Sequence, residues 1–107
     1  MSPEEIGEKV YRTQCALCHQ ADGGGVPDLQ PALAGSPIVL GDPAILIEVI
    51  EKGSNATSLQ SRESYGNAMA GYSHLSDEEL SAVASYVRNA FGNQAPEVSE
   101  QDVSSLR

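Results

Sequence analysis

The sequence is poor in the large apolar residues that fill the interior of a small domain. Its 107 residues include no tryptophan and one phenylalanine, and only 40% of them are hydrophobic. A chain of this length suits one domain, but these residues alone would build a thin core. A bound flat apolar group would supply the missing interior surface, so the composition agrees with a fold centred on a cofactor.

Positive charge is also scarce. Fifteen acidic residues stand against six lysines and arginines, and the formal net charge is −9. Such a surface makes nucleic acid and anionic lipid poor partners, and we expect instead a redox protein with a basic docking surface. No run of about 18 apolar residues is present, so we expect no membrane span. We also expect a monomer.

The only two cysteines lie in the motif Cys15-Ala16-Leu17-Cys18-His19. On a helix, residues three apart share one face, so both sulfurs can reach the two vinyl groups on one edge of a porphyrin. His19 then follows beneath the ring, where its imidazole can bind the iron. Because C-x-x-C-H is the attachment signature of c-type haem, the motif predicts one covalent haem c on Cys15 and Cys18, with His19 as an axial ligand.

The same residues allow three other interpretations. A C-x-x-C pair can be a thioredoxin-like redox motif, but that needs a strand–helix–strand context, which the sequence does not show. With His74, the motif supplies four ligands for a structural zinc ion, although the adjacent Cys18 and His19 fit poorly around one tetrahedral ion. A disulfide between Cys15 and Cys18 would be strained. The redox and zinc alternatives predict a colourless protein.

Three main helices are expected, joined by long irregular loops. They should begin at residues 3, 43 and 77, after capping residues. The first should end at about residue 15 or slightly beyond, and the other two at about residues 53 and 92. Residues 20–41 are rich in glycine and proline and should wrap the edge of the haem. Residues 54–67 are polar and should form a surface excursion. The sequence therefore predicts an all-α fold, with three main helices and long loops wrapped around one covalent haem.

The domain is expected to span residues 1–107, with a haem-binding body over 1–92 and a C-terminal tail over 93–107. In the body, the first and last helices should cross at Gly7, which allows close approach. We expect Tyr11, Val83 and Tyr86 around this crossing. In the tail, three apolar residues are expected to pack back on the body, namely Val98, Val103 and Leu106.

The iron has a second axial position, and Met69 is the candidate for it. Apart from Met1 it is the only methionine, and small residues flank it in the loop Gly66-Asn67-Ala68-Met69-Ala70-Gly71. A His/Met pair raises the reduction potential and closes the iron to exogenous ligands, which suits electron transfer. Met69 could instead fill a gap in the core. His74 is a competing ligand that would give a bis-histidine site, but we expect it to be a surface residue just before the last helix.

The sequence has four tyrosines. Tyr11, Tyr65 and Tyr86 are expected to be packing groups whose hydroxyls find hydrogen-bond partners. Tyr72 lies three residues after Met69, and we expect it in the haem environment.

Over nearly its whole length the sequence resembles the class I c-type cytochromes with one haem. Twelve residues after His19 comes Pro31-Ala32-Leu33-Ala34-Gly35, which is similar to the P-x-L-x-G loop of that family. The resemblance implies that the Pro31 carbonyl accepts a hydrogen bond from His19 and orients its ring. It also implies that Leu33 packs on the porphyrin and that Met69 is the distal ligand. Ala70 stands where the family often has proline.

A closer resemblance is carried by the segments 67–69, 85–93, 95–96 and 103–107. They are similar to cytochrome c domains that are attached to, or partner, periplasmic quinoprotein alcohol and sugar dehydrogenases. Similar domains are fused to some copper nitrite reductases and terminal oxidases. Attachment of haem to C-x-x-C-H resembles an extracytoplasmic process in bacteria, which implies a periplasmic protein. No signal peptide is visible, so we expect that an export signal or a larger parent protein was removed.

The expected function is one-electron transfer between a periplasmic dehydrogenase, or another redox enzyme, and a respiratory acceptor. No pair of residues suggests acid–base catalysis, so we expect an electron carrier and not an enzyme. Electrons should pass at the haem edge near Ala16, Leu17 and Ala70, which is uncharged. The alternative is a haem-based ligand-binding sensor or a peroxidase-like protein with a labile distal ligand.

Overall fold

The computed structural model describes residues 1–59, 66 and 68–107. Helices joined by loops make up this part of the chain, which contains no strand, and Val26 and Gln30 form one isolated antiparallel bridge. The predicted all-α fold is therefore confirmed. The predicted excursion over 54–67 falls partly outside the described residues, as do Tyr65 and Asn67. Within those residues, no helix is long and apolar enough to cross a membrane.

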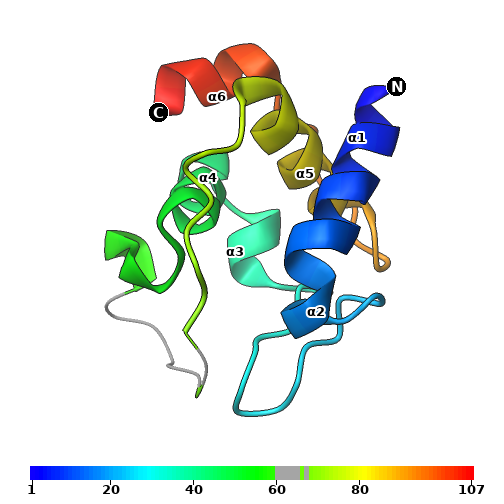
Figure 1. Ribbon diagram of the computed structural model, residues 1–107, viewed down its shortest axis with the longest axis vertical. Helices are drawn as coiled ribbons and strands as arrows, with labels where there is room; N and C mark the ends of the chain where they lie inside the picture. The colour runs from blue at the N-terminus through cyan, green and yellow to red at the C-terminus, as the bar shows by residue number, and fades with distance from the viewer. Residues whose placement is uncertain (60–65, 67) are drawn as a thin grey trace.

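Figure 1 shows the order of the helical segments. The α-helices are α1 (Pro3–Val10), α2 (Ala16–His19), α3 (Pro37–Leu40), α4 (Pro43–Lys52), α5 (Asp77–Asn89) and α6 (Glu100–Leu106). A π-helical segment, η1 (Tyr11–Cys15), joins α1 to α2, and the 3₁₀ turns η2 (Gly53–Asn55) and η3 (Thr57–Leu59) follow α4. The longer helices α1, α4 and α5 are those that the sequence predicts, whereas the short helices α3 and α6 were not expected.

The predicted helix starts are confirmed. At α1 and α5, the hydroxyls of Ser2 and Ser76 accept hydrogen bonds from backbone N–H groups three residues later, and each capping box is complete. Asp42 caps α4 by accepting a hydrogen bond from the N–H of Ala44. A third capping box, which the sequence analysis missed, begins α6 at Ser99. These side chains satisfy N–H groups that have no partner inside the helix.

The first stretch of helical backbone extends beyond Cys15, through η1 and α2 to His19. The end of the last long helix differs from its expected position. Helix α5 ends at Asn89, not at Gly92, because Phe91 turns back with a φ of 60°. The Phe91 ring then packs on Tyr11, with ring centroids 5.2 Å apart. This contact between distant segments, which the local sequence does not encode, replaces the last turn of the helix.

Helices α1 and α5 cross at Gly7, as predicted. A Cβ atom at Gly7 would meet the carbonyl oxygen of Ala82 and would lie 2.9 Å from the Cβ of Tyr86. One helical turn further on, the fully buried Tyr11 packs against Tyr86, with ring centroids 5.5 Å apart. Its hydroxyl donates to the carbonyl of Gln20, 2.5 Å away, and burial raises the pKa of Tyr11 to about 12. The crossing therefore fixes the helix that leads to the C-x-x-C-H motif.

The C-terminal tail packs on α5 through Val98 and Val103, which are 2% and 0% exposed. The hydroxyls of Ser81 and Ser85 donate to the carbonyl of Val98 and hold the tail in place. The predicted packing of Leu106 is wrong, because its side chain is 44% exposed. Leu106 is the last residue of α6 and lines a solvent-open groove between α6 and α4.

The guanidinium of Arg88 is an unexpected polar group inside this core. Only 3% exposed, it donates to the carbonyls of Pro96, Val39 and Gly41 at 2.7, 3.0 and 2.9 Å. These acceptors lie in the tail, in α3 and in the turn before α4. One side chain thus satisfies three backbone carbonyls and joins three segments.

We predict that Gly7→Ala destabilises the protein by about 1–3 kcal/mol, because the added methyl group overpacks the crossing. An alanine at an exposed helical site would instead stabilise by about 1 kcal/mol. Guanidinium chloride unfolding, followed by circular dichroism, measures the change. Lys9→Ala, an exposed substitution in the same helix, is the control and should shift stability by less than about 0.5 kcal/mol. A stabilised Gly7→Ala variant would contradict the close contact.

Arg88→Ala should cost about 3 kcal/mol, because it leaves backbone carbonyls of three segments without their donor. Arg12→Ala is the matched control. Its guanidinium is 72% exposed and pairs with Glu8 one turn away, so its loss should cost less than about 1 kcal/mol. The same unfolding experiment compares the two variants, and equal losses would show that the buried contacts of Arg88 contribute nothing special.

Candidate haem-binding site

The two cysteines lie at the junction of η1 and α2. Cys15 is half-buried, Cys18 is exposed, and neither forms a disulfide. Burial, with a smaller contribution from Cys18, raises the pKa of the Cys15 thiol to about 11. A nucleophilic redox cysteine needs a lowered pKa, so this environment is the opposite of a thioredoxin-like site. The two thiols instead occupy one helical turn, as attachment to one edge of a porphyrin requires.

His19 ends α2 and points inward. The residue is 7% exposed, and its Nδ1 lies 2.9 Å from the carbonyl oxygen of Pro31. A carbonyl can only accept, so Nδ1 carries the proton and Nε2 keeps its lone pair. Among the described residues, Nε2 has no hydrogen-bond partner. The ring is therefore oriented, in the correct tautomer, to bind a metal through Nε2.

Gly25 brings Pro31 to His19. Just after α2, the N–H of Gly25 donates to the carbonyl of His19, 3.0 Å away. Gly25 has a φ of 67°, and a Cβ there would lie 2.6 Å from the carbonyl oxygen of Gln30 and 2.7 Å from the N of Ala32. Only glycine fits this close approach. The turn-rich segment thus folds tightly against the end of α2.

Leu33 is held by hydrogen bonds from two directions. Its N–H donates to the carbonyl of Gly23 at 2.7 Å, and its carbonyl accepts from the side-chain amide of Asn93 at 3.1 Å. Asn93 is 5% exposed and also binds Gly35 and Val87. No role was predicted for Asn93 from the sequence. The available signal was a lone asparagine directly after the glycine that follows α5.

The Met69 segment lies along the end of α4 and reaches the cysteines through Tyr72. Figure 1 shows it rising toward the start of α5. The N–H of Tyr72 donates to Ile50 of α4 at 2.9 Å, and its hydroxyl donates to the carbonyl of Gln14 at 2.8 Å. Burial, and then the nearby cysteines, raise the pKa of Tyr72. The structure thus places Tyr72 next to the attachment turn, with the half-buried Met69 three residues before it.

His74 lies at the surface, as predicted. It is exposed, and its ring packs on Tyr72 with ring centroids 5.9 Å apart. Across the described part of the chain, no three histidine, cysteine or acidic side chains are grouped to hold a metal ion. The four-ligand zinc site with Cys15, Cys18, His19 and His74 is therefore not formed by this structure.

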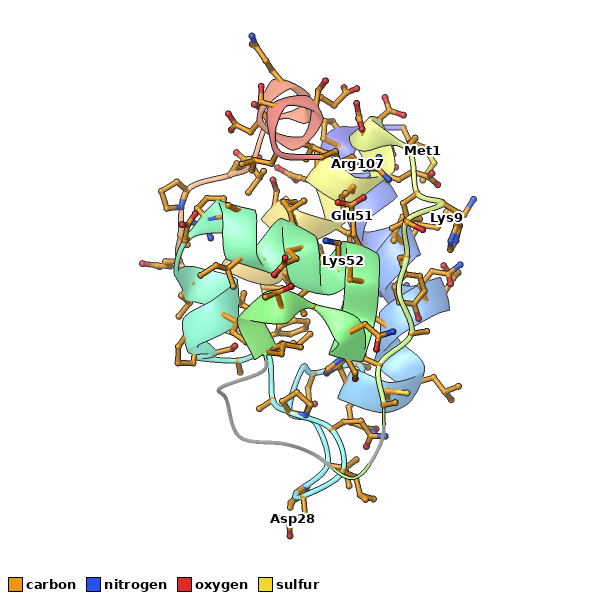
Figure 2. All side chains as sticks on the ribbon, turned by 90° about the vertical axis from the view of Figure 1, so that its left-hand side faces the viewer. Met1, Lys9, Asp28, Glu51, Lys52 and Arg107 are labelled. Carbon is orange, nitrogen blue, oxygen red and sulfur yellow. The ribbon has the colours of Figure 1, made fainter. Side chains whose placement is uncertain are left out.

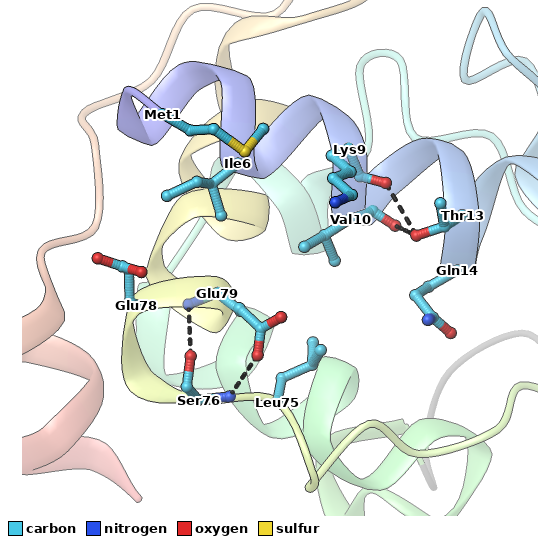
Figure 3. Close-up of a pocket in the computed structure, with 10 residues that line it drawn as sticks. All are labelled: Met1, Ile6, Lys9, Val10, Thr13, Gln14, Leu75, Ser76, Glu78 and Glu79. Carbon is cyan, nitrogen blue, oxygen red and sulfur yellow. Dashed lines mark hydrogen bonds between the residues drawn. The ribbon is translucent and has the colours of Figure 1, made fainter.

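The donor set fits a haem c. Two free thiols lie on one helical turn, an oriented imidazole presents Nε2, and a thioether lies on a segment tied to that turn. Figure 3 shows a groove elsewhere, between α1 and the start of α5, where Ile6 and Val10 face Leu75. None of the predicted site residues lines it. We therefore assign the haem to the attachment turn and not to this groove.

An apolar side chain lies exposed on the attachment turn. Leu17 is 91% exposed, between two residues that would be joined to the porphyrin. Ala70, next to Met69, is exposed as well. Two exposed, uncharged side chains thus lie at the site, although most of the chain's charged residues are acidic.

Comparison with known proteins agrees with this geometry. A family model described as cytochrome c matches residues 4–91. The chain is 41% identical over 104 residues to the cytochrome c subunit of the quinone alcohol dehydrogenase of Gluconobacter oxydans, an alignment that covers 94% of this chain and 22% of that subunit. It is 34% identical over 91 residues to cytochrome c-552 of Thermus thermophilus, covering 81% of this chain and 69% of that protein.

A third relative is the fructose dehydrogenase cytochrome subunit of Gluconobacter japonicus, which is 34% identical over 109 residues. The chain spans 22% of the length of each of the two dehydrogenase subunits. The family match covers most of the chain and includes the whole C-x-x-C-H motif. The chain therefore belongs to the cytochrome c family, carries a covalent haem c and acts in electron transfer.

Proposed function

We propose that this chain passes single electrons through a haem c whose iron is held by His19 and Met69. The bound group supplies an iron that alternates between the ferric and ferrous states. The hydrogen bond between His19 Nδ1 and Pro31 carries this proposal, because it leaves Nε2 free and fixes the ring. The same bond increases the basicity of the imidazole, so His19 stays a strong donor in both oxidation states.

Met69 is proposed as the second axial ligand. Its segment is tied to the attachment turn by the Tyr72–Gln14 hydrogen bond, and its backbone is bound to the end of α4. A thioether favours the ferrous state and leaves the iron without an open position. These residues therefore suit electron transfer better than ligand binding. Leu33 and Tyr72 are proposed to line the porphyrin, and Cys15 and Cys18 to form the two thioethers.

The proposed partners are a dehydrogenase as the donor and a respiratory acceptor, in the periplasm. Support for the donor comes from the dehydrogenase subunits of which this chain matches a part. We propose that the chain forms one cytochrome c domain and works as a monomer. Contact would be made through the exposed, uncharged edge at Leu17 and Ala70, because such a patch releases a partner quickly.

Long-range attraction would come from the acidic residues. The first turns of α1, α5 and α6 contain seven of them, at Glu4, Glu5, Asp77, Glu78, Glu79, Glu100 and Asp102. Figure 1 places these three helix starts at the end where both termini lie, away from α2. Capping hydrogen bonds from Ser2 and Ser76 lower the pKa values of Glu5 and Glu79, which keeps them charged. A basic docking surface on the partner is proposed from this field.

Met69→Ala should abolish the weak charge-transfer band of sulfur-ligated ferric haem, lower the reduction potential and allow carbon monoxide to bind the ferrous protein rapidly. Absorption spectra and a redox titration measure these changes. Met1→Ala removes the other methionine, which is 75% exposed, and should leave all three properties unchanged. A Met69→Ala variant that kept the band would refute the proposed ligand. Rapid carbon monoxide binding by the unaltered protein would favour a sensor.

The acidic field predicts opposite salt effects for reagents of opposite charge. Oxidation of the ferrous protein by a cationic cobalt(III) ammine complex should slow as salt is added, whereas oxidation by ferricyanide should accelerate. Both effects should level off near 0.15 M, where the screening length is about 8 Å. The molecule is 34 Å long, so acids at its far end are then screened from the exchange edge. Stopped-flow rates that do not change with salt for either reagent would contradict steering by net charge.

A further inference from the structure

We propose that Ser54 is a positioning residue that holds Met69 in place for binding the iron. The proposal rests on the ligation of iron by Met69 proposed above. It assigns a role to a serine that lies fifteen residues before the methionine and that no motif singles out.

The contact between the two residues is reciprocal. The N–H of Met69 donates to Ser54 Oγ at 2.7 Å, and the N–H of Ser54 donates to the carbonyl of Met69 at 3.0 Å. Both backbone groups of the proposed ligand are thus bound to one residue. This restricts the peptide planes on both sides of Met69 and so fixes the direction in which its side chain leaves the backbone.

Ser54 is itself attached to a rigid element. It follows Gly53, the C-cap of α4, whose Leu46 and Ile47 are 3% and 1% exposed and anchor the helix in the core. Gly53 has a φ of 61°, and a Cβ there would meet the carbonyl oxygens of Met69 and Ala70. The glycine therefore lets the Met69 segment approach the helix end closely enough for the serine to bind it.

The neighbours of Met69 do not restrict it by themselves. Ala68 and Ala70 are exposed, and neither brings the φ restriction of a proline. The next anchor along the chain is the N–H of Tyr72 on the carbonyl of Ile50, at 2.9 Å. The hydroxyl of Ser54 is the side-chain group that binds the backbone of Met69 itself. Its loss should raise the population of the state in which sulfur has left the iron.

The test uses the haem-loaded protein and external imidazole, which binds the ferric iron only after the sulfur has dissociated. Its apparent affinity therefore reports the dissociated fraction. Ser54→Ala should raise this affinity about fivefold, the change in an equilibrium that one ordinary hydrogen bond produces. Ser54→Thr keeps a hydroxyl and should behave like the unaltered protein. Ser54→Val, whose side chain has the shape of threonine without the hydroxyl, should behave like Ser54→Ala. The comparison of the threonine and valine variants still tests the proposal if the alanine variant does not fold.

Ser81→Ala is the control for general loosening. It removes another hydroxyl that bonds to a backbone group, the carbonyl of Val98 at 2.7 Å, in a different part of the fold. Chemical unfolding should detect its loss, while the affinity for imidazole should not change. If Ser81→Ala raised the affinity as much as Ser54→Ala, the effect would be general loosening and the specific role of Ser54 would be wrong.

The results for the Met69 and Ser54 variants separate the role of Ser54 from the ligation of iron by Met69. If Met69→Ala loses the sulfur charge-transfer band but Ser54→Ala and Ser54→Val bind imidazole like the unaltered protein, Met69 is the ligand and Ser54 does not position it. If Met69→Ala keeps the band, the proposed ligation fails, and with it the role of Ser54.

Discussion

The hydrogen bond from His19 to the carbonyl of Pro31 is the interaction on which the site depends. It fixes the tautomer and the direction of the imidazole, and it turns a flexible donor into an oriented one. Two structural features serve it: the helical backbone that ends at His19, and the tight turn at Gly25 that returns the chain. A side chain in place of the Gly25 hydrogen would collide with the backbone that carries the acceptor.

Long loops surround the site, and hydrogen bonds to a few side chains hold them. Irregular backbone inside a protein has polar groups that no helix or strand satisfies, so other groups must satisfy them. Arg88 and Asn93 do this from within the core, where both are nearly fully buried. Ser54 and Tyr72 do it for the segment that contains Met69. The loops are thus positioned by polar contacts to rigid helices, which lets a core with few aromatic residues support them.

The helix starts could be predicted because they depend on local chemistry. The end of α5 and the packing of Leu106 were wrongly predicted because they depend on contacts between distant parts of the chain. The capping groups at Ser2, Asp42 and Ser76 act within three residues, so the sequence pattern is sufficient to locate them. The end of α5 depends on Phe91 packing against a tyrosine eighty residues earlier, which no local rule contains. Leu106 was expected inside because it is apolar, but Val103 already fills the contact between α6 and the body.

The sequence by itself determined the attachment chemistry. The spacing of Cys15, Cys18 and His19 within one helical turn specifies a porphyrin edge and a ligand through the geometry of the helix alone. Only the tertiary structure decided what holds the surrounding loops: that Gly25 lets the Pro31 turn approach the end of α2, that Asn93 binds Leu33, and that Ser54 binds the backbone of Met69. The reason is physical, since groups separated by many residues meet only when loop closure and core packing bring them together.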